Sequence, residues 1–182
     1  MGNAMLISWG ASARRRLARA RRQPLLPFGH SSFNELLEAT RRTRLPEIHH
    51  SLEAWFVADG PLACIGTPSE GKAVILIHDL LNDPGTPAVV WELIALHELL
   101  HLAVPPRELN GRVSDHPPEF FEREAQLNPT RQEAWDWIWE RFGTVLRVDK
   151  EREGVMVRRD WRAVRRAQTR CIESIRRRRE AY

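Results

Sequence analysis

The chain of 182 residues is long enough for one domain with a substantial hydrophobic core, but too short for a second large domain. Its hydrophobic content of 42% and charged content of 29% are ordinary for a globular protein, so composition assigns no function. Only two cysteines are present, Cys64 and Cys171, and their wide separation excludes a disulfide framework and a cysteine zinc ribbon. We expect a cytoplasmic protein without a membrane partner, because no run of about 18 apolar residues occurs.

The net charge of +4 is distributed unevenly along the chain. Residues 1–46 and 147–182 each carry a net charge of +7, whereas residues 47–146 carry −10. We therefore interpret residues 47–146 as the core domain, residues 1–46 as a basic N-terminal helical arm and residues 147–182 as a basic C-terminal helical extension. Arginine-rich arms can bind phosphate backbones, which makes nucleic acid a candidate partner. The alternative is that the arginines form a solvated helix surface.

The first predicted element is an amphipathic helix over residues 31–42, where a serine can cap the start and Phe33, Leu36 and Leu37 share one face. Residues 51–81 contain short β-prone runs separated by glycine, proline and serine, which predict two or three antiparallel strands. A core that combines a small sheet with helices is therefore expected.

A second helix is predicted to start near Pro87, with Thr86 as its N-cap, and to end at Pro105 and Pro106. It is apolar on nearly all sides, and such a helix is typically buried.

Two further helices are predicted toward the C-terminus. A capping box at Thr130–Glu133 starts the first, and Gly143 can end it. Its apolar residues recur at helical spacing and are expected in the core: Trp135, Ile138, Trp139 and Phe142. Arginines interspersed with apolar residues predict a long basic helix at the end of the chain. The sequence of residues 146–157 leaves open whether a hairpin precedes that helix.

The helix that starts near Pro87 carries His97, Glu98 and His101 within an otherwise apolar sequence. Burying a polar group without a partner costs about 2 to 7 kcal/mol, so three unpartnered groups would be too costly. His97 and His101 are four residues apart and share a helix face, so both can bind one zinc ion. Glu98 lies beside them and can reach a zinc-bound water. The alternative is a chance HExxH match with two histidines satisfied in the core.

A catalytic zinc ion needs a third protein ligand. His116 is the only histidine after His101 and is the leading candidate, with Asp115, Glu119 and Glu122 as alternative oxygen ligands. Glu119 can instead support His116 without binding the metal.

Anchoring of His116 is predicted from the residues around it. Pro117–Pro118 open a short helix in which Phe120 and Phe121 are expected to pack inward and hold His116 in place. The connection that precedes His116 is expected to bend at Asn110–Gly111.

The stretch "HELLHL" followed by "DHPPEFF" resembles the SprT-like and YgjP-like zincin metallopeptidases, in which HExxH is followed by a histidine-aromatic pattern. The resemblance covers about residues 73–121. It implies an α+β zincin-like domain, in which a small antiparallel sheet packs on the HExxH helix beside additional helices. It also implies His97, His101 and His116 as zinc ligands, Glu98 as general base, and residues 73–81 as the strand along which a peptide substrate lies.

These residues predict a zinc-dependent metallopeptidase that hydrolyses peptide or protein substrates. Zinc lowers the pKa of its bound water toward about 7, and Glu98 takes the proton and later delivers it to the leaving amine. His78 and Arg112 are candidates for a second donor to the carbonyl. Two alternatives stay open: a nucleic-acid-binding protein with a structural zinc site, and an inactive zincin that serves as an interaction module. The oligomeric state and the cleavage preference do not follow from the sequence.

Overall fold

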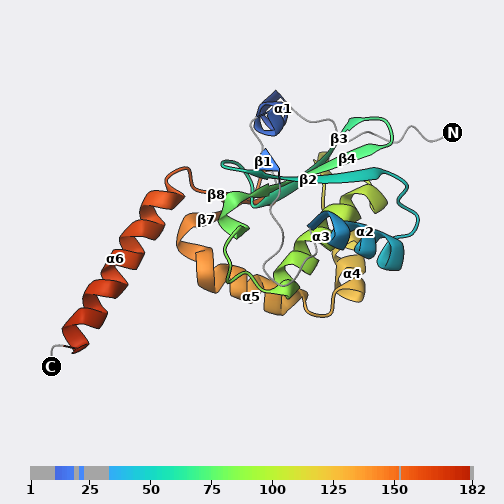
Figure 1. Cartoon of the computed structure of the whole chain (residues 1–182). Coiled ribbons are helices and arrows are strands. Elements are labelled where there is room, and N and C mark those ends of the chain that lie inside the picture. The colour runs from blue at the N-terminus through green and yellow to red at the C-terminus, as the bar shows by residue number, and fades with distance from the viewer. Residues whose placement is uncertain (1–10, 19–20, 23–32, 152, 181–182) are drawn as a thin grey trace.

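The computed structural model describes residues 11–18, 21–22, 33–151 and 153–180 and shows a mixed α+β protein, as predicted (Figure 1). Helices lie along one face of a four-stranded sheet of order β1-β2-β4-β3, and a short helix lies on the other face. The strands of this sheet are β1 (Arg21–Arg22), β2 (Ser51–Val57), β3 (Ala63–Ser69) and β4 (Lys72–His78). The helices are α1 (Ala11–Ala18), α2 (Phe33–Arg44), α3 (Ala88–Ala103), α4 (Pro118–Leu127), α5 (Arg131–Phe142) and α6 (Trp161–Glu180). Two small hairpins complete the description: β5 (Arg107–Leu109) with β6 (Arg112–Ser114), and β7 (Leu146–Asp149) with β8 (Gly154–Val157).

The sheet is not purely antiparallel, so the predicted strand arrangement is wrong in part. β3 and β4 form an antiparallel hairpin, but β4 pairs in parallel with β2. In the sheet, β4 lies between β2 and β3, and β3 forms one edge. From Ala73 to His78 every residue of β4 is buried, so both of its faces need cover and the interior of the sheet suits it best.

Helix α2 confirms the helix predicted near residue 31, although its capping serines lie outside the described residues. Phe33 and Leu37 are fully buried, and Phe33 packs edge-on against Trp91 of α3 with ring centroids 5.6 Å apart. The segment 1–46 thus contributes a helix to the same hydrophobic core as residues 47–146.

Helix α3 begins and ends where predicted, from Ala88 to Ala103. The predicted N-cap is wrong, because Pro87 occupies that position without a side-chain cap. The Thr86 hydroxyl instead donates to the carbonyl of Leu81 at 2.8 Å and closes the preceding turn. Nine residues of α3 are buried, which places this helix at the centre of the core.

The connection after α3 bends as predicted, since Asn110 and Gly111 adopt φ values of +53° and +77° in the turn between β5 and β6. The hairpin that the sequence left open is present as β7 and β8.

Helix α5 is confirmed, but its predicted capping box is wrong. The Thr130 hydroxyl donates to Oδ1 of Asn128 at 3.0 Å and accepts no hydrogen bond from the first turn of the helix. Ile138 and Phe142 are buried as expected, whereas Trp139 is 38% exposed.

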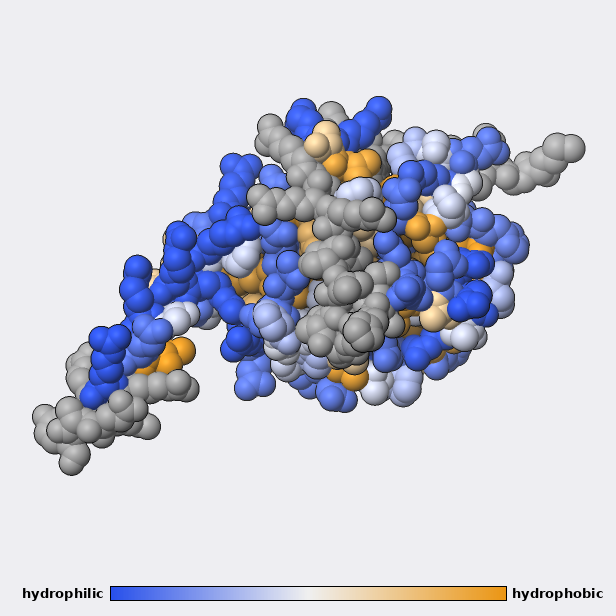
Figure 2. Space-filling view, viewed as in Figure 1, coloured by the Kyte–Doolittle hydropathy of each residue, from blue (hydrophilic) through white to orange (hydrophobic). Residues whose placement is uncertain are grey.

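Helix α6 confirms the long basic helix and extends away from the rest of the protein (Figure 1). Trp161 and Val164 in its first turns pack against the core. Beyond them its described surface is mostly hydrophilic but includes an apolar patch (Figure 2), and Ile172 is exposed. Within the described part of the chain, no helix combines the length and the apolar character needed to cross a membrane.

Candidate metal centre

The side chains of His97, His101 and His116 form a cluster beside the C-terminal half of α3. His97 and His101 lie one turn apart on α3, and His116 lies between β6 and α4. One ligand atom from each lies within 4.8 Å of the others. The Nε2 atoms of His97 and His116 are 3.2 Å apart, close to the about 3.3 Å that separates two tetrahedral ligands of one zinc ion. The three side chains are therefore close enough to bind a metal ion.

Phe120 of α4 forms the base of this cluster. It is fully buried, and its ring centroid lies 5.1 Å from that of His97 and 4.8 Å from those of His101 and His116. The predicted inward packing of Phe120 is thus confirmed. Phe121 is 48% exposed and stacks on His116 from the outside, so its predicted burial is wrong.

Glu98 lines the same cavity as the three histidines and is 3% exposed. Its Oε2 atom is buried without a hydrogen-bond partner among the described residues. Burial raises the pKa of Glu98 to about 7, with the charge of His97 opposing this effect and that of Glu124 adding to it. A carboxyl group with a pKa near neutrality is suited to accept a proton and return it.

The protonation state of His101 and His116 also suits metal binding. Burial, together with the charges of His97 and His116, holds the pKa of His101 well below its usual range. Burial and the charge of His97 lower the pKa of His116 to about 4. Both rings are therefore neutral at pH 7, which is the form that donates a lone pair to a metal ion.

Glu124 orients His97, and the sequence analysis missed it. Its carboxylate is 2% exposed, Oε1 lies 2.7 Å from Nδ1 of His97, and Oε2 accepts a hydrogen bond from Arg131 at 3.1 Å. Burial disfavours a charge on His97, but the hydrogen bond to Glu124 and the negative charges of Glu98 and Glu124 together outweigh it and raise the pKa of His97. Nδ1 bound to Glu124 leaves Nε2 facing the other histidines. The sequence contains one signal for Glu124. It lies four residues after Phe120, so the two side chains share the helix face that packs against the histidines.

Glu153, in the turn between β7 and β8, holds the segment that carries His116. One of its carboxylate oxygens accepts hydrogen bonds from the Ser114 hydroxyl at 2.7 Å, from the backbone N–H of Asp115 at 3.1 Å and from that of His116 at 3.3 Å. Nδ1 of His116 lies 3.7 Å from the same oxygen. No local pattern in the sequence links these two segments.

The alternative ligands are placed differently. Asp115 lines the cavity but is exposed, and burial with the charge of Glu153 raises its pKa. Glu119 pairs with Arg107 at 3.1 Å, so the prediction that it supports His116 is wrong. Glu122 is exposed and does not line the cavity.

The two candidates for a second carbonyl donor also lie outside the cavity that contains Glu98. His78 is fully buried, accepts a hydrogen bond from the backbone N–H of Leu80 at 3.0 Å and packs edge-on against Trp161. Arg112 is exposed on β6.

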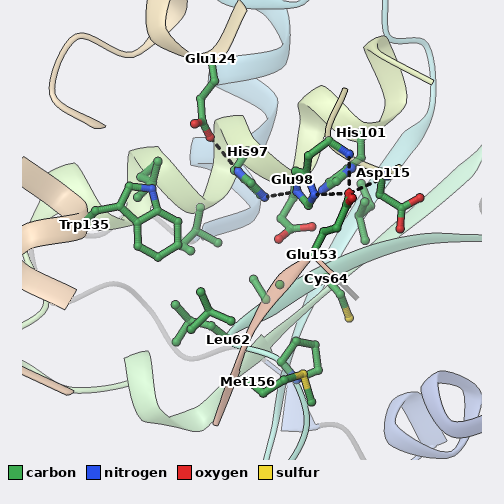
Figure 3. Close-up of a pocket in the computed structure, with 18 of the residues that line it drawn as sticks. Leu62, Cys64, His97, Glu98, His101, Asp115, Glu124, Trp135, Glu153 and Met156 are labelled. Carbon is green, nitrogen blue, oxygen red and sulfur yellow. Dashed lines mark hydrogen bonds and ion pairs between the residues drawn. The ribbon is translucent and has the colours of Figure 1, made fainter. Parts of the chain in front are cut away.

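The cavity has a volume of about 710 Å³, within the usual range for ligand pockets. Its walls come from the loop before β3, from β3 itself, and from α3, α5 and β8. Figure 3 shows His97, His101 and Glu98 on one side of this space, with Leu62 and Met156 facing them. Because β4 lies inside the sheet, the prediction that a peptide lies along residues 73–81 is wrong. The edge strand beside the cavity is β3.

No family model matches this sequence, and comparison with curated proteins and with solved structures finds no match either.

Proposed function

We propose that this protein is a zinc-dependent metallopeptidase with a zincin-like fold. The observation that carries the proposal is the position of Glu98, a buried carboxylate with an unpartnered Oε2 atom, in one cavity with three histidines close enough to bind a metal ion. The neutral state of His101 and His116 and the orienting contact between Glu124 and His97 support the same conclusion.

Each side chain has a distinct role in this proposal. His97, His101 and His116 would hold the zinc ion, which would supply Lewis acidity toward water and the peptide carbonyl when bound. Glu98 accepts the proton of the attacking water at its unpartnered Oε2 and passes it to the leaving amine. Edge strand β3, which lines the cavity through Ala63, Cys64 and Ile65, offers its backbone to an extended peptide.

The number of histidines in the cluster favours a catalytic metal site over a structural one. Structural zinc sites have four protein ligands, whereas the cluster found in the described part of the chain contains three. The intact Glu98 likewise favours an active enzyme over an inactive zincin that serves as an interaction module.

The test separates proton transfer from metal binding. Glu98→Gln should keep zinc, because Glu98 is no ligand, and should lower the rate of peptide hydrolysis by about 10²- to 10⁴-fold. Glu92→Gln, on the outer side of the same helix, should leave both unchanged. Zinc content by mass spectrometry and cleavage of an unfolded protein substrate provide the two measurements. Loss of zinc in Glu98→Gln, or hydrolysis equal to that of the parent, would contradict the assignment.

We propose a second activity for α6, namely binding of nucleic acid phosphates. Arg166, Arg170 and Arg177 are exposed, and their spacing of four and seven residues places them on one face of this projecting helix. A row of guanidinium groups along one face complements the charge of a phosphate backbone.

A further inference from the structure

The cavity beside the histidines has an apolar side that none of the roles assigned above uses. Six of its lining residues come from four separate parts of the chain: Leu62 before β3, Leu93 and Ile94 on α3, Trp135 on α5, and Val155 and Met156 on β8. Leu62, Leu93 and Ile94 are almost fully buried and form its floor. Trp135, Val155 and Met156 are half-buried and form walls with apolar surface still open to a ligand.

This apolar side is continuous with the histidine cluster. Leu93 and Ile94 precede His97 and Glu98 by four residues, one turn of α3, so the floor and the reactive groups share one helix face. In Figure 3, Trp135 and Leu62 lie on one side of His97, whereas Asp115 and Glu153 lie on the other. A group held at the histidines therefore has an apolar surface on one side and carboxylates on the other.

The charged group next to Trp135 on α5 is already paired. Arg131, four residues before Trp135, donates to Glu124, and Glu124 in turn contacts His97. Arg16 is the other arginine of the lining; it lies next to Cys64, on the sheet side, and its Nε is buried without a hydrogen-bond partner among the described residues. A charged side chain placed against Trp135 would lose its hydration without gaining an unpaired opposite charge there, which is costly.

The walls are also held rigidly. The backbone N–H of Leu62 donates to the carbonyl of Val155 at 2.7 Å, and that of Val157 donates to the carbonyl of Gly60 at 3.1 Å. These hydrogen bonds join β8 to the loop before β3, so the floor and one wall form a continuous surface. A preformed pocket binds without a large cost of ordering.

We propose that this apolar pocket selects substrates by a large aliphatic or aromatic side chain next to the bond to be cleaved. The inference rests on the proposed peptidase function, because the histidine cluster places the reacting carbonyl beside the pocket. Leucine, methionine and phenylalanine side chains match its lining, whereas glycine leaves it empty and aspartate meets no unpaired opposite charge beside Trp135.

Binding of small hydroxamates to the zinc-loaded protein tests the proposal without turnover. Four probes share one hydroxamate group and carry a hydrogen, isobutyl, benzyl or carboxymethyl substituent next to it, and calorimetry measures each dissociation constant. The isobutyl and benzyl probes should bind roughly 10- to 100-fold more tightly than the unsubstituted probe, as expected for burial of a large apolar side chain. The carboxymethyl probe should gain nothing.

Two variants and one control locate the effect. Trp135→Ala should remove most of the gain for the benzyl probe, whereas Trp139→Ala, on the same helix but outside the cavity, should retain it. Met156→Arg places a positive charge on the wall and should shift the preference to the carboxymethyl probe. Because Met156 is half-buried at the edge of a hairpin, this second variant tests the pocket even if Trp135→Ala is poorly folded.

The outcomes distinguish this proposal from the proposed function. If all four probes bind the zinc-loaded protein equally, the pocket does not select an apolar side chain, and the metal site stands. If no probe binds although zinc is present, the metal offers no open position, and both proposals are wrong.

Discussion

At the scale of single residues, the contact between Glu124 and His97 shows how a buried carboxylate can determine which nitrogen of a histidine faces a metal ion. The contact joins α3 to α4 over 2.7 Å and is continued by Arg131 on α5. Hydrogen bonds of this kind to metal-binding histidines fix the ring and increase its basicity.

The first residue-scale prediction follows from this contact. Glu124→Ala should reduce zinc affinity by about 10- to 100-fold, because His97 loses the partner of its Nδ1. Glu122→Ala, an exposed position on the same helix, should bind zinc like the parent. Competition with a fluorescent zinc chelator gives both affinities. If Glu122→Ala weakened binding and Glu124→Ala did not, the ligand would be the carboxylate that the sequence analysis considered as an alternative to His116.

A second residue-scale prediction concerns His78. Burial, aided by the charge of Arg162, lowers the pKa of His78 from 6.5 to about 4 in the folded protein. Above pH 6.5 His78 is neutral in both the folded and the unfolded protein, so its burial carries no protonation penalty. As the pH falls from 6.5 through 4, the unfolded protein takes up a proton at His78 before the folded protein does, and the fold loses stability. The loss amounts to about 3 kcal/mol of the free energy of unfolding.

The matched variant for this measurement is His78→Asn. Its amide oxygen can accept the hydrogen bond from Leu80 but cannot become protonated. Urea unfolding of both metal-free proteins at pH 7 and pH 4.5 should show that the parent loses about 2 to 3 kcal/mol more than the variant. An equal loss in both proteins would mean that His78 is not responsible for it.

The residues of the candidate site differ in how far the sequence reveals them. His97, Glu98 and His101 are predictable because helical periodicity alone brings them together. His116 is predictable only as the remaining histidine, since its distance from the others depends on the packing of Phe120. Glu124 and Glu153 contact the site through tertiary structure. The four-residue spacing from Phe120 distinguishes Glu124 from the exposed glutamates of the same helix, but only once Phe120 is known to face the histidines.

At the scale of elements, the same contrast separates helices from the sheet. Helix α3 was predictable from its prolines and its continuous apolar sequence. The parallel pairing of β2 with β4 was not, because short apolar runs do not specify which strand of a hairpin lies inside. The predictions that Thr86 and Thr130 cap helices were wrong for a related reason. Both hydroxyls form hydrogen bonds with nearby atoms outside the helix that follows, and these bonds replace the predicted caps.

The element-scale prediction concerns the hairpin of β7 and β8. Glu153→Ala removes three hydrogen bonds to residues 114–116, so His116 should become less ordered and zinc affinity should fall by about tenfold. Faster hydrogen exchange at the amides of Asp115 and His116 should accompany this loss. Glu151→Ala, an exposed position in the same turn, should change neither measurement. Unchanged exchange in Glu153→Ala would show that other contacts hold the segment.

At the scale of the whole molecule, the basic helix α6 projects away from the acidic part of the protein. The start of α6 is attached to the acidic part of the protein by ion pairs from Arg162 to Asp79 at 2.9 Å and from Arg165 to Asp83 at 3.1 Å. Arg166, Arg170 and Arg177 lie farther along the helix and are exposed, so this basic surface points away from the acidic core.

The molecular-scale prediction is a salt dependence. Duplex DNA should bind at low salt, and the triple variant Arg166→Gln, Arg170→Gln and Arg177→Gln should reduce the slope of log K against log salt by about 2 to 3. Fluorescence anisotropy at several salt concentrations measures both slopes. Peptide hydrolysis by the triple variant should equal that of the parent. Absence of binding at low salt would instead favour the solvated-surface interpretation.

The hydrogen bonds that join β8 to residues 60–62 also have a consequence for biosynthesis. The ribosome makes the chain from its N-terminus, so residues 97–116 emerge before residues 146–157. Until β7 and β8 have been translated, His116 lacks the contact with Glu153, and the cavity lacks Val155 and Met156. A nascent chain therefore carries its three histidines without a finished pocket. Under the proposed peptidase function, cleavage can begin only when this domain has been translated almost to its end.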